Sequence, residues 1–257
     1  MDNSVENPME KSGISNLLIP NWPAPAGVQA LVTTREHGAS MGPWASFNLA
    51  SHVGDDLAAV TANRAQLRQS MPSEPPWLTQ VHGTLCVDAA QVRSGVEADA
   101  SFTRQRGVVC AVLTADCLPV LLCDDNASVV AAIHAGWRGL ADGVIEASVA
   151  AMAVPRERLM AWLGPAIGPA AFEVGAEVRD AFLMHDRQAA QAFTPIAKEK
   201  WLCDIYLLAR QRLQALSIRR ITSAEFPGYC TVRDIDCFYS FRRDGVTGRM
   251  ASCIWLE

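Results

Sequence analysis

Two short apolar runs, at residues 119–123 and 128–133, flank the polar turn sequence Asp-Asp-Asn-Ala. This pattern predicts a β-hairpin. A loop of two or four residues would place Cys117 directly opposite His134, with Cβ atoms roughly 4.5 to 5.5 Å apart on one face. A thiolate and an imidazole at that separation could share one metal ion. A loop of three or five residues would shift the register by one and remove this pairing.

The same pattern predicts the other elements. Further strands are expected at 27–34, 77–88 with a bend at Gly83, 160–163, 218–224, 238–249 with a turn at 243–245, and 250–256. Helices are expected at about 57–71 with Asp55 or Asp56 as N-cap, from the turn at 136–139 to about 152, at 176–193, and at 201–216. Strands interleaved with hairpins and helices predict an α+β fold, with a mixed sheet and helices on its outer faces.

Two residues do not fit their elements. Pro119 has no N–H to donate, which predicts that its strand lies at a sheet edge or is bulged near Cys117. Arg64 falls on the apolar stripe of the predicted helix at 57–71. A buried guanidinium needs a partner, so Arg64 either forms a structural contact or binds an anion or substrate, and the sequence favours neither.

Composition narrows the class of protein. A chain of 257 residues with 50% hydrophobic and 19% charged residues is expected to form one compact domain. A net charge of −5 and the lack of a Lys/Arg-rich run argue against nucleic acid as a partner. Residues 1–15 form a polar leader without the apolar core of a secretion signal, and no apolar run approaches the ~18 residues of a membrane span. We therefore expect a cytoplasmic protein.

The chain has eight cysteines and five histidines. Without a secretion signal or a Cys-x-x-Cys pair, the cysteines are expected to be reduced, and most, such as Cys110 and Cys123, to serve in packing. His82 lies at the predicted bend and is the best candidate for a third metal ligand. His37, His52 and His185 fit ordinary loop or surface positions, with His52 held in reserve.

Two further segments suggest contacts with a substrate. The turn Gly136–Gly139 leads from a strand into a helix, where free N–H groups and Arg138 could hold an anion, although Gly-x-x-Gly is a weak signal alone. Glu173 stands among small and apolar residues. It could be a general acid or could cap the helix that follows, and both interpretations stay open.

Four motifs together resemble the YfiH family, also labelled laccase-domain, polyphenol-oxidase-like or peptidoglycan editing factor. They are Thr79-Gln-Val-His-Gly83, Thr114-Ala-Asp-Cys-Leu-Pro119, His134-Ala-Gly-Trp-Arg-Gly139 and Phe238-Tyr-Ser-Phe-Arg-Arg-Asp-Gly245. The similarity runs from about Gly27 to the C-terminus. It implies a single catalytic domain at 16–257 with layered mixed β-sheets flanked by helices.

The resemblance also implies zinc bound by His82, Cys117 and His134, with copper possible in vitro. The implied chemistry is phosphorolysis of adenosine, inosine and methylthioadenosine, together with adenosine deamination, in a monomer or weak homo-oligomer that takes a purine nucleoside and phosphate. The implied catalytic residues are Cys117, His82, His134 and Asp116, and the implied substrate contacts are Asn48, Arg64, Gln80, Arg138 and Glu173. Relatives often have His at the position of Phe241. Phenylalanine can neither bind a metal nor carry protons, so no such role is expected of it here.

Other functions remain to be weighed. Multicopper oxidation needs more imidazoles than five and paired His-x-His ligands, which this chain lacks. A metal-free hydrolase or amidase with Cys117 as nucleophile and His134 as base, editing a cell-wall precursor, fits the same spacing. A non-catalytic, zinc-stabilised interaction domain is the third alternative.

Overall fold

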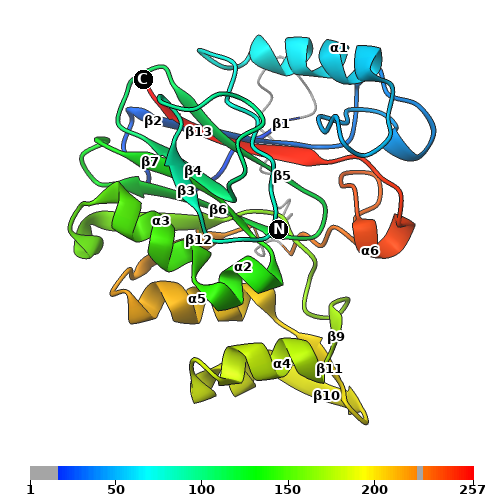
Figure 1. Cartoon of the computed structure of the whole chain (residues 1–257), viewed down its shortest axis with the longest axis vertical. Helices are drawn as coiled ribbons and strands as arrows, with labels where there is room; N and C mark the ends of the chain where they lie inside the picture. Colours follow the sequence, from blue (N-terminus) through cyan, green and yellow to red (C-terminus); the bar gives the residue numbers. More distant parts are fainter. Residues whose placement is uncertain (1–16, 225–227) are drawn as a thin grey trace, which may run out of the picture.

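The computed structural model describes residues 17–224 and 228–257, so the predicted polar leader at 1–15 lies outside the described residues. Two β-sheets pack face to face within them (Figure 1). The first is antiparallel, with the order β1-β2-β13-β5. Its strands are β1 (Leu17–Leu18), β2 (Val28–Thr33), β13 (Met250–Leu256) and β5 (Val109–Thr114).

The second sheet has the order β12-β8-β6-β7-β4-β3 and is mixed. β12 with β8 and β3 with β4 run parallel, and the other pairs are antiparallel. Its strands are β3 (Cys86–Asp88), β4 (Ala100–Thr103), β6 (Leu118–Asp124), β7 (Val130–Ala135), β8 (Leu159–Leu163) and β12 (Arg220–Ser223).

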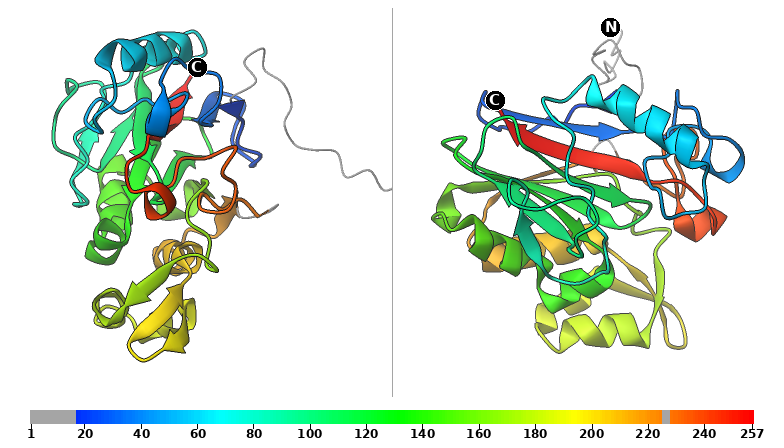
Figure 2. Two further views of the ribbon diagram at one scale, coloured as in Figure 1. Left: turned by 90° about the vertical axis from the view of Figure 1, so that its right-hand side faces the viewer. Right: turned by 45° about the horizontal axis from the view of Figure 1, so that its top comes forward.

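Helices cover both outer faces of the stacked sheets (Figure 1). Helix α1 (Leu57–Arg68) lies on the first sheet, and α2 (Trp137–Asp142), α3 (Val144–Met152) and α5 (Ile205–Ala215) cover the second. A small sheet protrudes beyond α5 (Figure 2). It has the order β10-β11-β9 and comprises β9 (Glu173–Gly175), β10 (Phe193–Ala197) and β11 (Lys200–Cys203), with α4 (Ala176–Leu183) beside it. The fold is α+β, as predicted.

Short helical segments complete the described structure. They are α6 (Phe241–Asp244) and the 3-10 helices η1 (Gly42–Trp44), η2 (Arg156–Arg158) and η3 (Arg187–Ala192). The core lies in three apolar layers, and β13 shows how one strand serves two of them. Ile254 packs between the two sheets, whereas Cys253 and Trp255 face α1. Burial on both faces explains why this strand is apolar at every position except Ser252.

The predicted hairpin forms, but its register was wrong by two residues. His134 pairs with Pro119 rather than with Cys117. The cause is Asp124, whose carboxylate accepts hydrogen bonds from the Ser128 amide at 2.6 Å and the Val129 amide at 3.1 Å. These bonds keep Ser128 and Val129 in the loop, so that Cys123 pairs with Val130 instead of Ser128. A shift of two residues keeps the strand side chains on their faces. Cys117, in the turn just before β6, still lies close to His134.

Pro119 lies in a central strand, so the predicted edge position was wrong. Its carbonyl accepts the Gly164 amide at 2.8 Å, at the end of β8. The reciprocal bond, from a residue-119 N–H to the Gly164 carbonyl, cannot form because proline has no N–H. The Tyr206 hydroxyl donates to that carbonyl instead, at 3.1 Å. A side chain thus supplies the donor that the proline removes.

Several predicted boundaries also changed. One predicted helix is split into α2 and α3 at Gly143, which has a φ of 101°. The helix predicted at 201–216 begins only after Asp204, whose carboxylate accepts the Leu207 amide at 2.9 Å, while Trp201 belongs to β11. The helix predicted at 176–193 ends at Leu183, before η3.

Three further expectations on elements were wrong. The segment 238–249 contains α6 and no strand, and of the strand predicted at 77–88 only Cys86–Asp88 forms. Leu57, placed on the inward stripe of α1, is exposed, whereas Asn63 is buried. Of the helices in residues 17–224 and 228–257, none combines the length and the apolar character that a membrane crossing requires.

Asp124→Ala should destabilise the protein strongly. The Asp124 carboxylate is fully buried, accepts bonds from Ser128 and Val129, and pairs with Arg158 at 2.5 Å. Removing it leaves these donors unpaired, so we expect the free energy of unfolding to fall by about 3 kcal/mol in urea titrations. Asp125→Ala, at the exposed neighbouring position, is the matched control and should have a much smaller effect.

The pH dependence of stability tests the same carboxylate. Burial raises the pKa of Asp124, but hydrogen bonds from Ser128 and Val129 and the charge of Arg158 outweigh it and lower that pKa. The stabilising contribution is therefore present above the unfolded pKa of about 4 and is lost as pH falls through the lower folded-state pKa. An equal stability difference between wild type and Asp124→Ala at pH 7 and at pH 2 would contradict this assignment.

Candidate metal centre

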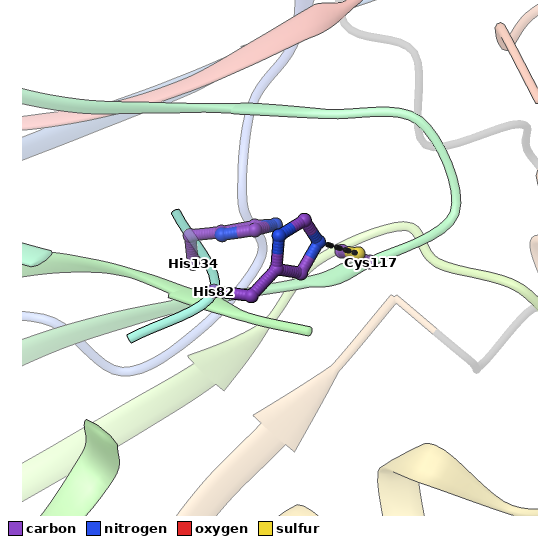
Figure 3. A group of neighbouring side chains, drawn as sticks. All are labelled: His82, Cys117 and His134. Atoms are coloured by element: carbon purple, nitrogen blue, oxygen red, sulfur yellow. Dashed lines mark hydrogen bonds between the residues drawn. The ribbon is translucent and has the colours of Figure 1, made fainter. Parts of the chain in front are cut away.

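Three side chains converge where the two sheets meet the loop at residues 80–85 (Figure 3). His82 comes from that loop, Cys117 from the turn between β5 and β6, and His134 from β7. Their ligand atoms all lie within 4.8 Å of one another. The Cys117 Sγ is 3.8 Å from the His82 Nε2, and the two imidazole rings meet edge to face with centroids 4.8 Å apart. The structure thus brings together the three ligands expected from the sequence.

A buried carboxylate, Asp99, holds both histidines. One oxygen, Oδ1, contacts the His134 Nδ1 at 2.7 Å and accepts the His82 amide at 2.9 Å. The other, Oδ2, accepts the amides of Val81 at 3.1 Å and Gly83 at 2.7 Å. Since Nδ1 of His134 faces Asp99, its Nε2 is left to face the other ligands. His82 itself has a φ of 61°, a conformation that these three amide bonds hold.

Asp99 was not selected from the sequence. It directly precedes β4 and lies opposite His134, whose amide donates to the Asp99 carbonyl at 2.7 Å. No strand was predicted at 97–103, so nothing placed this residue beside β7. The available signal was an acidic residue between Ala98 and Ala100, because a carboxylate in apolar sequence needs hydrogen-bond donors in the fold.

Two glycines allow the ligands to approach. A Cβ on Gly136 would lie 2.7 Å from the His82 ring and 3.1 Å from the Cys117 sulfur. A Cβ on Gly139 would lie 2.7 Å from the Gly83 carbonyl oxygen. The two contacts of 2.7 Å are too short for real atoms. A larger residue at either glycine would therefore push the loop that bears His82 away from Cys117. The Gly-x-x-Gly sequence therefore serves close packing at this point.

The electrostatics favour a thiolate. Burial raises the pKa of the Cys117 thiol, but the charge of His134 and hydrogen bonds from His134 and His82 lower it to about 6. Burial lowers the pKa of His134, whereas the Cys117 charge and the contact with Asp99 raise it to about 9. By contrast, burial raises the pKa of the Cys86 thiol to about 11. Cys117 is thus prepared as a metal ligand or a nucleophile, which both require the thiolate.

The donor set fits one metal ion. Tetrahedral zinc with sulfur and nitrogen ligands has edges of about 3.3 to 3.6 Å. The observed 3.8 Å between Cys117 Sγ and His82 Nε2 is close to such an edge. Three protein ligands also leave a fourth position for another group, as in catalytic zinc sites. The residues present therefore could hold a metal ion of this kind.

A cavity of about 410 Å³ adjoins the three ligands. Its volume falls within the range of about 300 to 1,000 Å³ typical of small-molecule sites. Three of its aromatic side chains each carry a stacked arginine. Arg138 lies 4.4 Å from the Trp137 ring, Arg242 lies 5.4 Å from Phe172, and Arg249 lies 5.8 Å from Phe241. The walls thus combine flat apolar surfaces with positive charge.

Two of the residues expected to contact substrate, Gln80 and Arg138, line this cavity, and so does Asp116, which was expected to be catalytic. The Gln80 amide group exchanges two hydrogen bonds of 2.7 Å with the Leu113 backbone, which fixes its position. His52, the reserve histidine, also lines the cavity, as do Arg242 and Arg249, which were not selected. The pairing of Met250 with Thr114 brings Arg249 beside the turn that bears Cys117, and a sequence pattern does not reveal that pairing.

Three other expected contacts lie away from the described lining. The Asn48 side chain is buried and binds Asp55 and the Ala50 backbone. Arg64 donates twice to the Leu49 carbonyl, at 2.8 and 2.9 Å, and stacks on the ring of Trp77.

Glu173, the third, is exposed. It forms an ion pair with Lys200 at 3.1 Å. It does not cap α4, which begins after Gly175 without a side-chain cap.

Comparisons with known proteins give consistent matches. A sequence profile described as "Multi-copper polyphenol oxidoreductase laccase" matches residues 29–257. A Pseudomonas aeruginosa protein named purine nucleoside phosphorylase is 51% identical over 241 residues, covering 93% of this chain and 98% of that protein. Purine nucleoside phosphorylase YfiH of Escherichia coli is 48% identical over 246 residues, covering 95% of this chain and 100% of that protein. A crystal structure of a Neisseria meningitidis protein matches with a TM-score of 0.90 and 49% identity, over 94% of this chain and 99% of that one.

Asp99→Asn should weaken metal binding by about 10- to 100-fold. An amide NH₂ in place of one oxygen must face either His134 and the His82 amide or the amides of Val81 and Gly83, so donors are left unpaired. Zinc affinity can be measured by competition with a chromophoric chelator. Asp180→Asn, at an exposed position on α4, is the control. Unchanged affinity in a folded Asp99→Asn protein would show that the carboxylate does not position the ligands.

Proposed function

The chain belongs to the YfiH family, whose sequence profile is described as multi-copper polyphenol oxidoreductase laccase, and we propose that it is a zinc-dependent purine nucleoside phosphorylase. Its substrates would be adenosine, inosine and methylthioadenosine, and its products the free base and (methylthio)ribose 1-phosphate. The observation that carries the proposal is a His-Cys-His ligand group beside a cavity walled by aromatic and arginine side chains. The proposed setting is the cytoplasm, as a monomer or weak homo-oligomer.

Zinc is the proposed metal because two imidazoles and a thiolate suit it and leave one position open. When bound, it would supply Lewis acidity beside the nucleoside. Copper binding would be adventitious. The three ligands form the one group of suitable residues found within 17–224 and 228–257, whereas a multicopper oxidase needs several such groups.

The cavity walls suit a purine and a phosphate. Trp137, Phe172 and Phe241 offer aromatic faces for a base, which gains stacking energy when it lies flat against a ring. In phosphorolysis a phosphate oxygen attacks C1′ of the ribose, the bond from C1′ to the base breaks, and its electron pair leaves with the base. The protein must therefore hold phosphate near the sugar and tolerate negative charge on the leaving base.

Arg249 is the proposed phosphate contact, with Arg138 of the same cavity lining as a second candidate. Arg249 lines the cavity together with Cys117. Burial lowers its pKa, and the charges of Cys117 and Asp116 oppose that shift without outweighing it. Its Nη1 donates to the carbonyls of Thr247 and Gly248. Within the described part of the chain its Nε and Nη2 have no such bond, so they are available to a phosphate. We prefer Arg249 to Arg64, whose guanidinium is engaged with Leu49 and Trp77.

Adenosine deamination is proposed as a secondary activity. It requires attack of water at C6 of adenine and a group that moves protons. Neither carboxylate suggested by the sequence suits that role, because Thr231 and Arg242 donate to both oxygens of Asp116, and Glu173 is exposed and paired with Lys200. Phosphorolysis needs no such carboxylate, so we expect it to be the main reaction.

A second candidate function is favoured by one observation. Asp99, His134 and Cys117 form a chain of acid, base and thiol in which Nδ1 of His134 contacts Asp99 and the thiol pKa is lowered to about 6. This order resembles that of hydrolases with a cysteine nucleophile. A metal-free hydrolase or amidase, acting on a cell-wall precursor, would use the same residues.

An assay with adenosine separates these functions. Zinc-loaded protein should form adenine and ribose 1-phosphate only when phosphate is present. Without phosphate a smaller yield of inosine should form, and with phosphate part of that inosine should be cleaved to hypoxanthine. Chelation of the metal or Cys117→Ala should abolish turnover, and Cys237→Ala, at a cysteine outside the cavity lining, should not. Chromatography of the products is the measurement. Full activity of metal-free protein on an amide substrate, with none on adenosine, would support the hydrolase instead.

Arg249→Ala should raise the KM for phosphate by about tenfold or more while changing the KM for adenosine less. The reason is that, of the two substrates, Arg249 would contact the phosphate and not the adenosine. Arg64→Ala should leave the phosphate KM nearly unchanged. Arg187→Ala, at an exposed position of η3, is the control for substituting an arginine away from the cavity. The reverse ranking of Arg249 and Arg64 would return the phosphate site to Arg64.

A further inference from the structure

Helix α6 (Phe241–Asp244) forms one wall of the cavity, although it has only four residues. So short a helix is not stable by itself, because nucleation costs more than one turn of hydrogen bonds returns. Its position must therefore be fixed by contacts with the rest of the protein. Two of its residues, Phe241 and Arg242, line the cavity, so whatever fixes α6 also fixes that wall.

The carboxylate of Asp116 makes such a contact. Its Oδ2 accepts the Arg242 amide at 2.6 Å, within the first turn of α6. Its Oδ1 accepts the Thr231 hydroxyl at 2.5 Å. Thr231 is fully buried and Asp116 nearly so. Both oxygens are thus engaged by donors of the protein.

The backbone of Asp116 is fixed as well. Its carbonyl accepts the Ile167 amide at 3.0 Å. Its φ is 88°, in a region where residues other than glycine are uncommon and aspartate and asparagine are enriched. Such a conformation persists only where surrounding contacts impose it. It directs the carboxylate toward α6 from the residue next to the metal ligand Cys117.

Other contacts of α6 lead elsewhere. The Ser240 hydroxyl accepts the Arg243 amide at 3.2 Å, and the Arg243 guanidinium donates to the carbonyls of Thr231 and Phe238. These bonds tie α6 to the neighbouring loop at 228–240. Among the described residues, the Asp116 carboxylate is the hydrogen-bond link between α6 and the turn that bears Cys117.

Helix α6 contributes two side chains to the cavity wall and connects it to the protruding sheet. Phe241 is 58% exposed and presents its ring beside Arg249. The Arg242 guanidinium donates to the Glu173 carbonyl at 2.9 Å and lies over the ring of Phe172. Helix α6 therefore spans from the metal-ligand turn to the protruding sheet at β9.

We infer that Asp116 is a positioning residue, whose carboxylate holds α6 so that Phe241 and Arg242 form the substrate-facing wall beside the metal ligands. This inference rests on the proposed function only in taking a nucleoside as the ligand of the cavity. It replaces the role of proton carrier that the sequence suggested for Asp116. A carboxylate whose two oxygens accept bonds from fixed donors is held for structure rather than placed to exchange protons with a ligand.

Asparagine distinguishes the two roles. Its Oδ1 can accept the Arg242 amide and its Nδ2 can donate to the Thr231 oxygen, so it can preserve both links. It also tolerates the left-handed backbone. It cannot carry a proton between substrate and solvent. Alanine removes both links but is strained at a positive φ, so the Asp116→Ala protein could fail to fold. Glycine removes both links and adopts this φ readily, so Asp116→Gly tests the same loss without that strain.

The kinetic test uses zinc-loaded, full-length protein with adenosine and saturating phosphate. For Asp116→Asn we expect kcat and KM within about threefold of wild type, and for Asp116→Ala and Asp116→Gly an adenosine KM raised about tenfold or more with a smaller fall in kcat. Asp142→Asn, at an exposed residue of α2, is the control. If Asp116→Asn lowers kcat for phosphorolysis or deamination about 100-fold with normal zinc content, Asp116 carries protons and the inference is wrong.

Hydrogen exchange of the α6 amides supplies a readout that does not depend on turnover. Mass spectrometry of peptides spanning residues 241–245 should show faster exchange in Asp116→Gly and wild-type exchange in Asp116→Asn. Unchanged exchange in Asp116→Gly would overturn the inference. If wild-type protein turns over no nucleoside, the proposed function fails, and exchange alone then decides the role of Asp116.

Discussion

The buried carboxylate of Asp99 is the interaction on which the centre depends. It accepts three consecutive amides of the loop that bears His82 and contacts the ring of His134. One charge thus fixes a loop and a strand relative to each other. A loop with a left-handed histidine would otherwise have many conformations, and ligand geometry requires one. Hydrogen bonds from the amides and the imidazole offset the cost of burying the carboxylate, and they lower its pKa although burial raises it.

The cavity is built where separate elements end. Strands β5 and β6 supply the turn with Cys117, β7 supplies His134, and the segment before β13 supplies Arg249. Backbone geometry is irregular at these ends, as the positive φ values of His82 and Asp116 show. The strands β5, β6, β7 and β13 behind them are buried along their whole length and supply rigidity. Loops and turns at the ends of rigid strands can direct several side chains into one small cavity.

The sequence predicted the fold class, most strands of the two large sheets and the convergence of His82, Cys117 and His134, but none of the small sheet β10-β11-β9. It did so because alternation and turn residues are local, and a two-residue error in the hairpin register left the side chains on the correct face. It missed Asp99 and Arg249 because their placement depends on pairing between distant strands. It also took the segment around Phe241 for a strand, since α6 is held by Asp116 and Thr231 rather than by its own propensity.

Part of the cavity wall comes from a different stretch of the chain than the ligands. All three ligands and Asp99 lie between residues 82 and 134, whereas the wall residues Phe172, Arg242 and Arg249 come from later segments. Mutations in the later segments can therefore reshape what enters without disturbing the ligand geometry. Such a division lets a lineage change its substrate while the reactive group stays constant. Proteins built this way are expected to share one chemistry and to differ in the molecules they process.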